Sequence, residues 1–278
     1  QRQMCIRDSY FAVLIGIGLY CRKHATDVNG FVLGGRSVGP WLTAFAYGTS
    51  YFSAVVFVGY AGQFGWKYGI AATWAGIGNA IIGSLLAWVV LGRRTRIMSQ
   101  HLDSATMPQY FGKRFGSNPL KIGASVIIFI FLIPYTASLY NGLSRLFGMA
   151  FNIDYSVCII IMATLTAIYV IAGGYMATAI NDFIQGIIML FGIVAVIAAV
   201  IHSKGGFMSA LQGLANVSDP AVSDTPGIFA SFFGPDPFNL LCVVILTSLG
   251  TWGLPQMVQK FYAIDNEASI QKLSLIHI

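Results

Sequence analysis

Charged side chains are scarce in this chain of 278 residues. Only 9% of the residues are Asp, Glu, Lys or Arg and 56% are hydrophobic, whereas about a quarter of an ordinary soluble domain is charged. Six uncharged runs each exceed the roughly 20 residues that a helix needs to cross a bilayer; they lie at 37–66, 68–92, 122–144, 155–181, 183–203 and 237–259. This composition excludes a water-soluble domain and predicts an all-α, polytopic membrane protein.

Cysteine is also sparse, and no sequence motif points to an enzyme. The four cysteines stand singly, without a metal-ligand or redox spacing, so we expect neither a disulfide framework nor a zinc site. No HExxH, GxSxG, phosphate-loop or paired-carboxylate motif occurs. The net charge of +6 comes from basic residues placed beside apolar runs, which is typical of membrane topology signals. We therefore predict no enzymatic activity, no cofactor and no nucleic-acid partner.

The hydropathy pattern predicts a short first helix and six longer spans. The first helix is apolar from Ser9 to Cys21, and the spans lie near 41–62, 70–92, 122–150, 155–172, 176–201 and 238–259. If the loops alternate sides, one side receives three basic residues (Lys67, Arg145 and Lys204) and the other receives eleven: Arg22, Lys23, Arg36, Arg93, Arg94, Arg96, Lys113, Arg114, Lys121, Lys260 and Lys272. Because cytoplasmic loops are rich in Lys and Arg, the second side is predicted to be cytoplasmic, in a multi-pass protein of the plasma membrane.

The loop at 202–237 is predicted to lie outside the cell. Within it, Phe207, Leu211 and Leu214 recur at helical spacing, which indicates a short amphipathic helix. This helix either packs as a lid or contacts a ligand.

The spans and their loops form one predicted transmembrane domain over 9–278. Residues 1–9 and 273–278 differ in character from the rest and are interpreted as non-native ends. We therefore expect the native chain to continue at both ends.

The span at 41–62 is unusual because small and polar residues occupy its middle. Gly48, Thr49, Ser50, Tyr51 and Ser53 stand where a lipid-facing helix would carry Leu, Ile and Val. One interpretation is close helix packing, with the hydroxyl groups bonding back to carbonyls of their own helix. The other is a helix that unwinds near 48–53, so that its freed carbonyls can coordinate a cation near the middle of the bilayer.

Asp182 is the one acidic residue within an otherwise apolar span. An ionisable group inside the membrane is costly, so its presence indicates a function, here a place on a cation path. Because Asp182 is near the cytoplasmic end of its predicted helix, the alternative is that it caps this helix by accepting backbone amide hydrogen bonds.

The last span contains a second candidate for a broken helix. Between Thr247 and Gln256, glycine and proline interrupt the apolar pattern, while Thr251 and Trp252 offer a hydroxyl group and an aromatic face. The alternative is a proline kink that only aids packing.

Two further sets of residues lie inside spans. Tyr135, Thr136 and Ser138 follow Pro134 and offer polar groups to the same cavity. Three glycines of the span at 70–92 are assigned to helix packing: Gly76, Gly78 and Gly83.

Three motifs occur in order along the chain. They are Gly34-Gly35-Arg36-Ser37-Val38-Gly39-Pro40-Trp41, Gly173-Gly174-Tyr175 leading to Asn181-Asp182-Phe183-Ile184-Gln185, and Gly253-Leu254-Pro255-Gln256. With these motifs the chain, from about Phe31 to Ala268, resembles the solute:sodium symporter family, whose branches carry proline, pantothenate, sugars and other small solutes. The resemblance implies an inverted-repeat transporter fold, with the first repeat at 41–201 and the start of the second at 238–272.

The resemblance also implies which residues hold the ligands. Sodium would be bound by backbone carbonyls of Thr49 and Phe52 and by hydroxyl groups of a later helix outside this sequence, with Asp182 near the sodium exit. The positions implied for the substrate are Tyr51, Ser53, Tyr135, Thr251 and Trp252. Sodium is the only metal implied, and it acts as a coupling ion.

The function implied is sodium-coupled symport of a small organic solute by alternating access, with the solute, Na+ and the lipid bilayer as partners. Similar proline carriers have an aspartate where this chain has Tyr51, so a pantothenate-type solute is favoured, while proline or another small carboxylate stays open. The alternative from another class is a membrane-embedded sensor that uses the same fold and carries a cytoplasmic kinase. A third is an inert truncated product, because without the second repeat we expect the 278 residues to be unable to transport.

Overall fold

The computed structural model describes residues 2–51, 60–223 and 225–276, and this part of the chain is helical apart from turns and two isolated bridges. The prediction of an all-α fold is therefore confirmed. The helices are α1 (Arg2–Cys21), α2 (Val28–Leu33), α3 (Pro40–Tyr51), α4 (Ala61–Tyr68), α5 (Thr73–Gly78), α6 (Arg93–His101), α7 (Met107–Phe115), α8 (Asn118–Phe151), α9 (Tyr155–Ser203), α10 (Phe207–Ala215), α11 (Pro237–Gly250), α12 (Pro255–Ala263) and α13 (Glu267–Ile276). Between them lie 3-10 turns η1 (Arg22–His24), η2 (Gly34–Arg36), η4 (Gly69–Ala72), η7 (Ile228–Ala230) and η8 (Thr251–Gly253), and π-helical η5 (Asn79–Leu86) and η6 (Trp88–Gly92).

Long apolar helices dominate the described residues. Three stretches, Ala61–His101, Asn118–Met149 and Tyr155–Ser203, are long and apolar enough to cross a membrane, and a bent pair formed by Pro237–Gly253 and Pro255–Ala263 makes a fourth. These bear out the prediction of a polytopic membrane protein. Of the span expected at 41–62, residues 41–51 belong to α3 and residues 60–62 are helical, while 52–59 lie outside the described residues.

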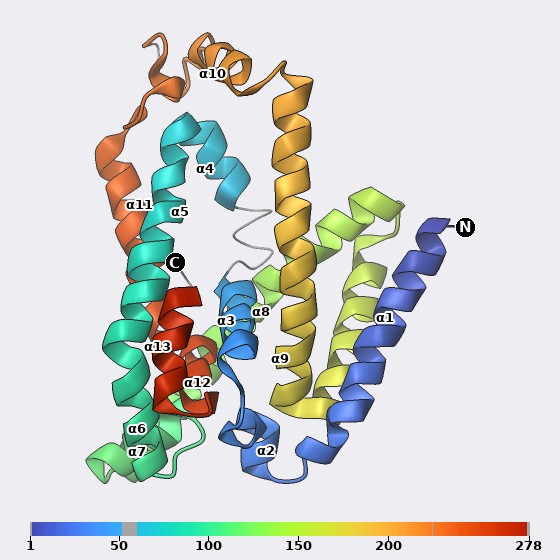
Figure 1. The fold of residues 1–278 in the computed structure, drawn as a ribbon, viewed down its shortest axis with the longest axis vertical. Helices are drawn as coiled ribbons and strands as arrows, with labels where there is room; N and C mark the ends of the chain where they lie inside the picture. Colours follow the sequence, from blue (N-terminus) through green and yellow to red (C-terminus); the bar gives the residue numbers. More distant parts are fainter. Residues whose placement is uncertain (1, 52–59, 224, 277–278) are drawn as a thin grey trace.

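Two glycines interrupt helices where the sequence predicted span boundaries. Gly69, just before the predicted span at 70–92, has φ +60° and ψ −137°. Gly174 has φ +57° and ψ −150°, and a β-carbon there would stand 2.8 Å from the carbonyl oxygen of Phe31. Only glycine adopts this backbone without strain. In Figure 1 the chain therefore turns back within α9, so that its first arm lies beside α1 and its second arm rises through the molecule.

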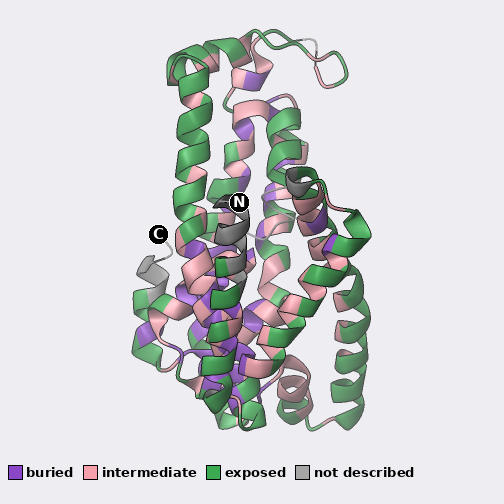
Figure 2. Ribbon diagram, turned by 90° about the vertical axis from the view of Figure 1, so that its right-hand side faces the viewer, coloured by how far each residue is buried: buried purple, intermediate pink, exposed green. Residues whose placement is uncertain are grey.

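The buried core lies toward one end of the molecule, as Figure 2 shows. Its centre is aromatic: the ring of Trp88 lies 5.4 Å from that of Tyr47 and 4.6 Å from that of Phe261, both edge-on. These contacts join η6, α3 and α12 into one packed unit. By contrast, none of the most apolar window of α8 is buried within the chain, so this helix presents its apolar surface outward, as a lipid-facing helix does.

The two ends of the molecule carry different elements. Figure 1 shows α2, α6 and α7 at one end and α4 and α10 at the other, and the predicted cytoplasmic basic residues of α6 and α7 thus share one end. The short helix predicted from Phe207, Leu211 and Leu214 is α10. Two of these basic residues are buried: Arg96 is 4% exposed within α6, and Lys260, which was expected in the loop after the last span, is 6% exposed within α12.

Candidate functional site

The helix predicted to break near 247–256 is indeed broken. α11 ends at Gly250 and η8 continues it to Gly253. Leu254 is extended with φ −68° and ψ 128°, and α12 starts at Pro255 after a bend of 54°. Proline is suited to the first helical position because its missing N–H would have no partner there. The sequence thus specifies both the end of one half-helix and the start of the next.

A cavity of about 800 Å³ opens beside this break. Its walls include Thr49 and Ser50 of α3, Tyr135 of α8, and Gln256 and Gln259 of α12. The amide nitrogen Nε2 and oxygen Oε1 of Gln256 are both buried without a hydrogen-bond partner among the described residues. An unpaired buried amide is unfavourable. The Gln256 amide can therefore donate a hydrogen bond to a ligand at the cavity wall and accept one from it.

α3 remains helical through residues 48–51 of the segment at 48–53 that was expected to unwind. The Thr49 hydroxyl donates to the carbonyl oxygen of Phe45 at 2.8 Å, and the Ser50 hydroxyl donates to that of Ala46 at 2.7 Å. For Thr49 and Ser50, this is the back-bonding that the packing interpretation predicted. The predicted ligands Phe52 and Ser53 lie outside the described residues.

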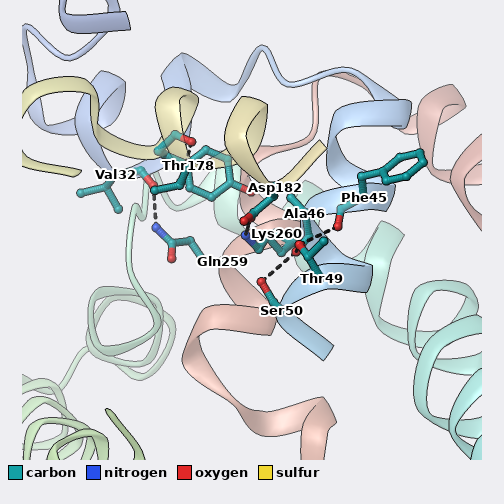
Figure 3. A network of polar contacts seen from close by, with 10 residues as sticks. Val32, Phe45, Ala46, Thr49, Ser50, Thr178, Asp182, Gln259 and Lys260 are labelled. Atoms are coloured by element: carbon teal, nitrogen blue, oxygen red, sulfur yellow. Dashed lines mark hydrogen bonds and ion pairs between the residues drawn. The ribbon is translucent and has the colours of Figure 1, made fainter. Parts of the chain in front are cut away.

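Asp182 faces Lys260 across the contact between α9 and α12. The carboxylate Oδ2 lies 3.9 Å from the Lys260 Nζ, and the ammonium lies 5.0 Å from the centre of the Tyr175 ring. In Figure 3 the Lys260 side chain points toward Asp182, in the region of Thr49 and Ser50. The capping alternative is wrong, because Asp182 lies about two turns inside the second arm of α9 and accepts no backbone hydrogen bond among the described residues.

Close packing brings α3 and α9 together at this point. The rings of Phe45 and Phe183 meet edge-on at 4.8 Å, and a β-carbon on Gly186 would stand 3.1 Å from the Thr49 Cγ2. The predicted residues Thr49 and Asp182 therefore belong to one contact region.

Among the described residues no three His, Cys, Asp or Glu side chains are grouped to hold a metal ion, so a cation here would also need carbonyl or hydroxyl oxygens.

A second polar cluster lies on the other side of α3. The Tyr51 hydroxyl donates to the Asn79 Oδ1 at 2.5 Å and accepts from the Thr251 hydroxyl at 3.4 Å. Asn79 also accepts from Ser248 at 3.2 Å and donates to the Thr247 hydroxyl at 3.3 Å. We call these residues the Tyr51 cluster: Tyr51, Asn79, Thr247, Ser248 and Thr251.

The predicted substrate residues thus fall into two groups. Tyr135 lines the cavity with Thr49, whereas Tyr51, Thr251 and Trp252 do not. The Trp252 indole N–H donates to the carbonyl oxygen of Ile82 at 3.0 Å. Sequence reasoning missed Asn79, although an amide inside the apolar span at 70–92 was a usable signal.

The glycine motif before α3 forms a clamp that sequence reasoning also missed. Gly34, Gly35 and Arg36 all have positive φ, and this turn sends the Arg36 guanidinium to carbonyl oxygens of Ser104 at 2.8 Å and Tyr262 at 3.4 Å. Partial burial lowers the pKa of Arg36, and the Asp103 carboxylate opposes that change. The clamp ties the end of α12 to the turn before α3.

A helix broken beside an internal cavity, with an intramembrane acid nearby, is typical of secondary transporters. The comparisons with known proteins agree with this class. The chain belongs to the sodium:solute symporter family, whose family model matches residues 31–278.

Two relatives illustrate the match. The chain is 31% identical over 260 residues to the osmoregulated proline transporter OpuE of Bacillus subtilis, covering 92% of this chain and 51% of the relative. It is 32% identical over 277 residues to a sodium/proline symporter of Staphylococcus aureus strain JH9, covering 95% of this chain and 50% of the relative. The chain thus spans about half the length of these relatives.

Proposed function

We propose that this chain forms the first half of a carrier in the plasma membrane that couples the entry of a small organic solute to the entry of Na+. The observation that carries the proposal is the cavity beside the broken α11–α12 helix. Its volume of about 800 Å³ is within the roughly 300–1,000 Å³ of small-molecule sites, and α12 begins at its wall. A half-helix start directs backbone N–H groups and a partial positive charge toward an anionic group.

The proposed substrate is a small carboxylate or amino acid, of the proline or pantothenate kind. Both relatives described above are named as proline carriers. We propose that Tyr135 contacts the solute directly and that the Gln256 amide forms hydrogen bonds with polar groups of the bound solute. Tyr51, Ser53, Thr251 and Trp252 stay proposed substrate residues; Tyr51 and Thr251 would have to give up a hydrogen bond to each other to make direct contact.

The proposed sodium ligands are the backbone carbonyls of Thr49 and Phe52, with Asp182 on the path of the ion. Sodium prefers hard oxygen ligands, and a carboxylate near an intramembrane helix break offers the charge that the ion needs. The contact between α3 and α9 supports this assignment, because it holds the Thr49 turn against the helix that carries Asp182.

The proposed mechanism is alternating access between two inverted repeats, the first at 41–201 and the second starting at 238–272. Sodium favours the outward state, the solute then closes the cavity, and both leave on the inside. Coupling requires sodium to bind the two states with different affinity. One charge crossing about 100 mV supplies about 2.3 kcal/mol, which at about 1.4 kcal/mol per factor of ten supports a solute gradient of roughly 50-fold.

The test is uptake of radiolabelled proline and of pantothenate into vesicles that carry the full-length protein. Uptake that rises with an inward sodium gradient, but not with an equal potassium gradient, supports the proposal and identifies the solute. If neither solute enters under any gradient, the substrate class proposed here is wrong.

Substituting Asp182 with asparagine tests the sodium path in the same assay. Asp182→Asn removes the negative charge while keeping the shape of the side chain, so we expect the sodium concentration for half-maximal uptake to rise about tenfold or more. Asn181→Asp/Asp182→Asn, which moves the carboxylate by one residue, is the positional control and should not restore the response. An unchanged sodium response of Asp182→Asn would remove Asp182 from the path.

A further inference from the structure

We propose that Lys260 is a built-in cation that competes with sodium for Asp182. In the sodium-free carrier the Lys260 ammonium neutralises the carboxylate, and sodium displaces it on binding. The inference rests on the proposed function, which supplies sodium as the second cation. It assigns a part in ion coupling to a residue of α12.

The position of Lys260 is the first observation. Its side chain is 7% exposed, it lies on the half-helix that starts at the break, and its neighbours Phe261 and Tyr262 are core residues. A charged lysine is rarely buried without a partner. Among the described residues, its ammonium has the Asp182 carboxylate and the Tyr175 ring face as partners and donates no hydrogen bond.

The looseness of the pair is the second observation. The distance of 3.9 Å between Lys260 Nζ and Asp182 Oδ2 exceeds the roughly 2.7–2.9 Å of a charge-assisted hydrogen bond. The Asp182 side chain is also 25% exposed, against 7% for Lys260. The carboxylate therefore keeps free acceptor positions and an open side, as a site that exchanges one cation for another requires.

The attachment of α12 is the third observation. The Gln259 amide donates to the carbonyl oxygen of Val32 at 2.6 Å, and the backbone of Val38 pairs with Ile264 in a short parallel bridge. α12 is thus joined to α2 and to the turn before α3, while Asp182 belongs to α9. A movement of α12 against α9 changes the distance between the ammonium and the carboxylate.

These observations indicate how the charge of Asp182 is neutralised at each stage of the transport cycle. An unpaired carboxylate inside the membrane is costly, so Asp182 needs one cation in each state of the carrier. Sodium supplies that cation on the loaded path, and Lys260 supplies it when the empty carrier returns. The same ammonium discourages sodium from rebinding after it has left.

The experiment compares Lys260→Met and Lys260→Gln with wild type in the full-length protein, purified in saturating sodium so that Asp182 stays neutralised. Sodium affinity is read from the sodium dependence of labelled-proline binding, or of labelled-pantothenate binding if that is the solute transported. Removing the competitor should tighten apparent sodium affinity about tenfold, within the roughly 5- to 150-fold range of coupling between sites. Lys260→Arg keeps the charge and should stay close to wild type.

Transport supplies a second readout. Net uptake requires the empty carrier to return, whereas exchange with sodium and solute on both sides does not. Lys260→Met should therefore lose most net uptake while keeping exchange. Lys67→Met is the matched control, because Lys67 also lies over a tyrosine ring, 5.2 Å from that of Tyr68, but at an exposed position outside the site.

The outcomes separate this inference from the proposed function. If wild type shows no sodium response, the proposed function fails. If wild type responds to sodium but Lys260→Met and Lys260→Gln leave sodium affinity unchanged or weaker, the inference is overturned and Lys260 is a structural partner of Asp182. Tighter sodium affinity with exchange preserved supports the competition.

Discussion

The two polar groups that flank α3 differ in how completely their atoms are hydrogen-bonded. In the Tyr51 cluster, hydroxyl and amide groups from α3, η5, α11 and η8 satisfy one another. Around the cavity and Asp182, the Gln256 amide has no partner among the described residues, and the ion pair to Lys260 is long. The two polar groups thus differ in that one has its hydrogen bonds formed within the protein and the other has donors and acceptors left without a protein partner.

This difference bears on where a ligand binds. A satisfied buried network is rigid and costly to open, so it suits a joint between helices. Groups left unpaired at a cavity wall gain hydrogen bonds when a ligand arrives. From this comparison we propose that ligand contacts lie at the cavity beside α12 and that the Tyr51 cluster is a structural joint. Three substitutions test that division.

The largest effect is expected at Gly83, against which the Tyr51 ring is packed. A β-carbon there would clash with the Tyr51 hydroxyl oxygen and lie 3.0 Å from its Cζ, so Gly83→Ala should destabilise the protein by about 2 kcal/mol through overpacking. The measurement is the thermal unfolding midpoint of the purified full-length protein. Gly76→Ala in the same span is the control, because no atom lies within 4 Å of its β-carbon position; equal behaviour of the two variants would contradict a tight joint.

An intermediate effect is expected at Gln256. Gln256→Met removes the unpaired amide at similar size, so substrate affinity should fall about tenfold, the loss of roughly one hydrogen bond, while stability stays equal or rises. Direct binding of labelled substrate and an unfolding curve measure both quantities. Gln212→Met, on the exposed face of α10, is the control. Lower stability with unchanged affinity would show that Gln256 belongs to the joint instead.

The smallest effect is expected at Tyr51. Tyr51→Phe removes one hydroxyl from the Tyr51 cluster and should cost about 1 kcal/mol of stability. Substrate affinity should change by less than about threefold, which is under 1 kcal/mol. Tyr60→Phe at an exposed position is the control. A large loss of affinity without loss of stability would return Tyr51 to the substrate contacts.

Several local features could be predicted because a single residue type enforces them. Glycine at 174 allows a backbone turn that a side chain would block, and proline at 255 begins a helix that cannot continue the previous one. The helix at 207–215 followed from its apolar spacing. Asp182 was identified by its cost in an apolar span, but its partner was not, because Lys260 lies far away in the chain and was taken for a loop residue.

The amino-acid sequence alone determined that this protein is a helical membrane protein of a transporter family, that its chain breaks near Gly174 and before Pro255, and that Asp182 is an acid inside a span. These properties depend on composition, on short-range spacing and on the backbone limits of glycine and proline. Only the tertiary structure decided that Lys260 meets Asp182, that Arg36 clamps α12, and that the hydroxyl of Tyr51 pairs with Asn79. Those contacts join residues far apart in the chain, and which buried polar groups meet depends on how the helices pack rather than on any local pattern.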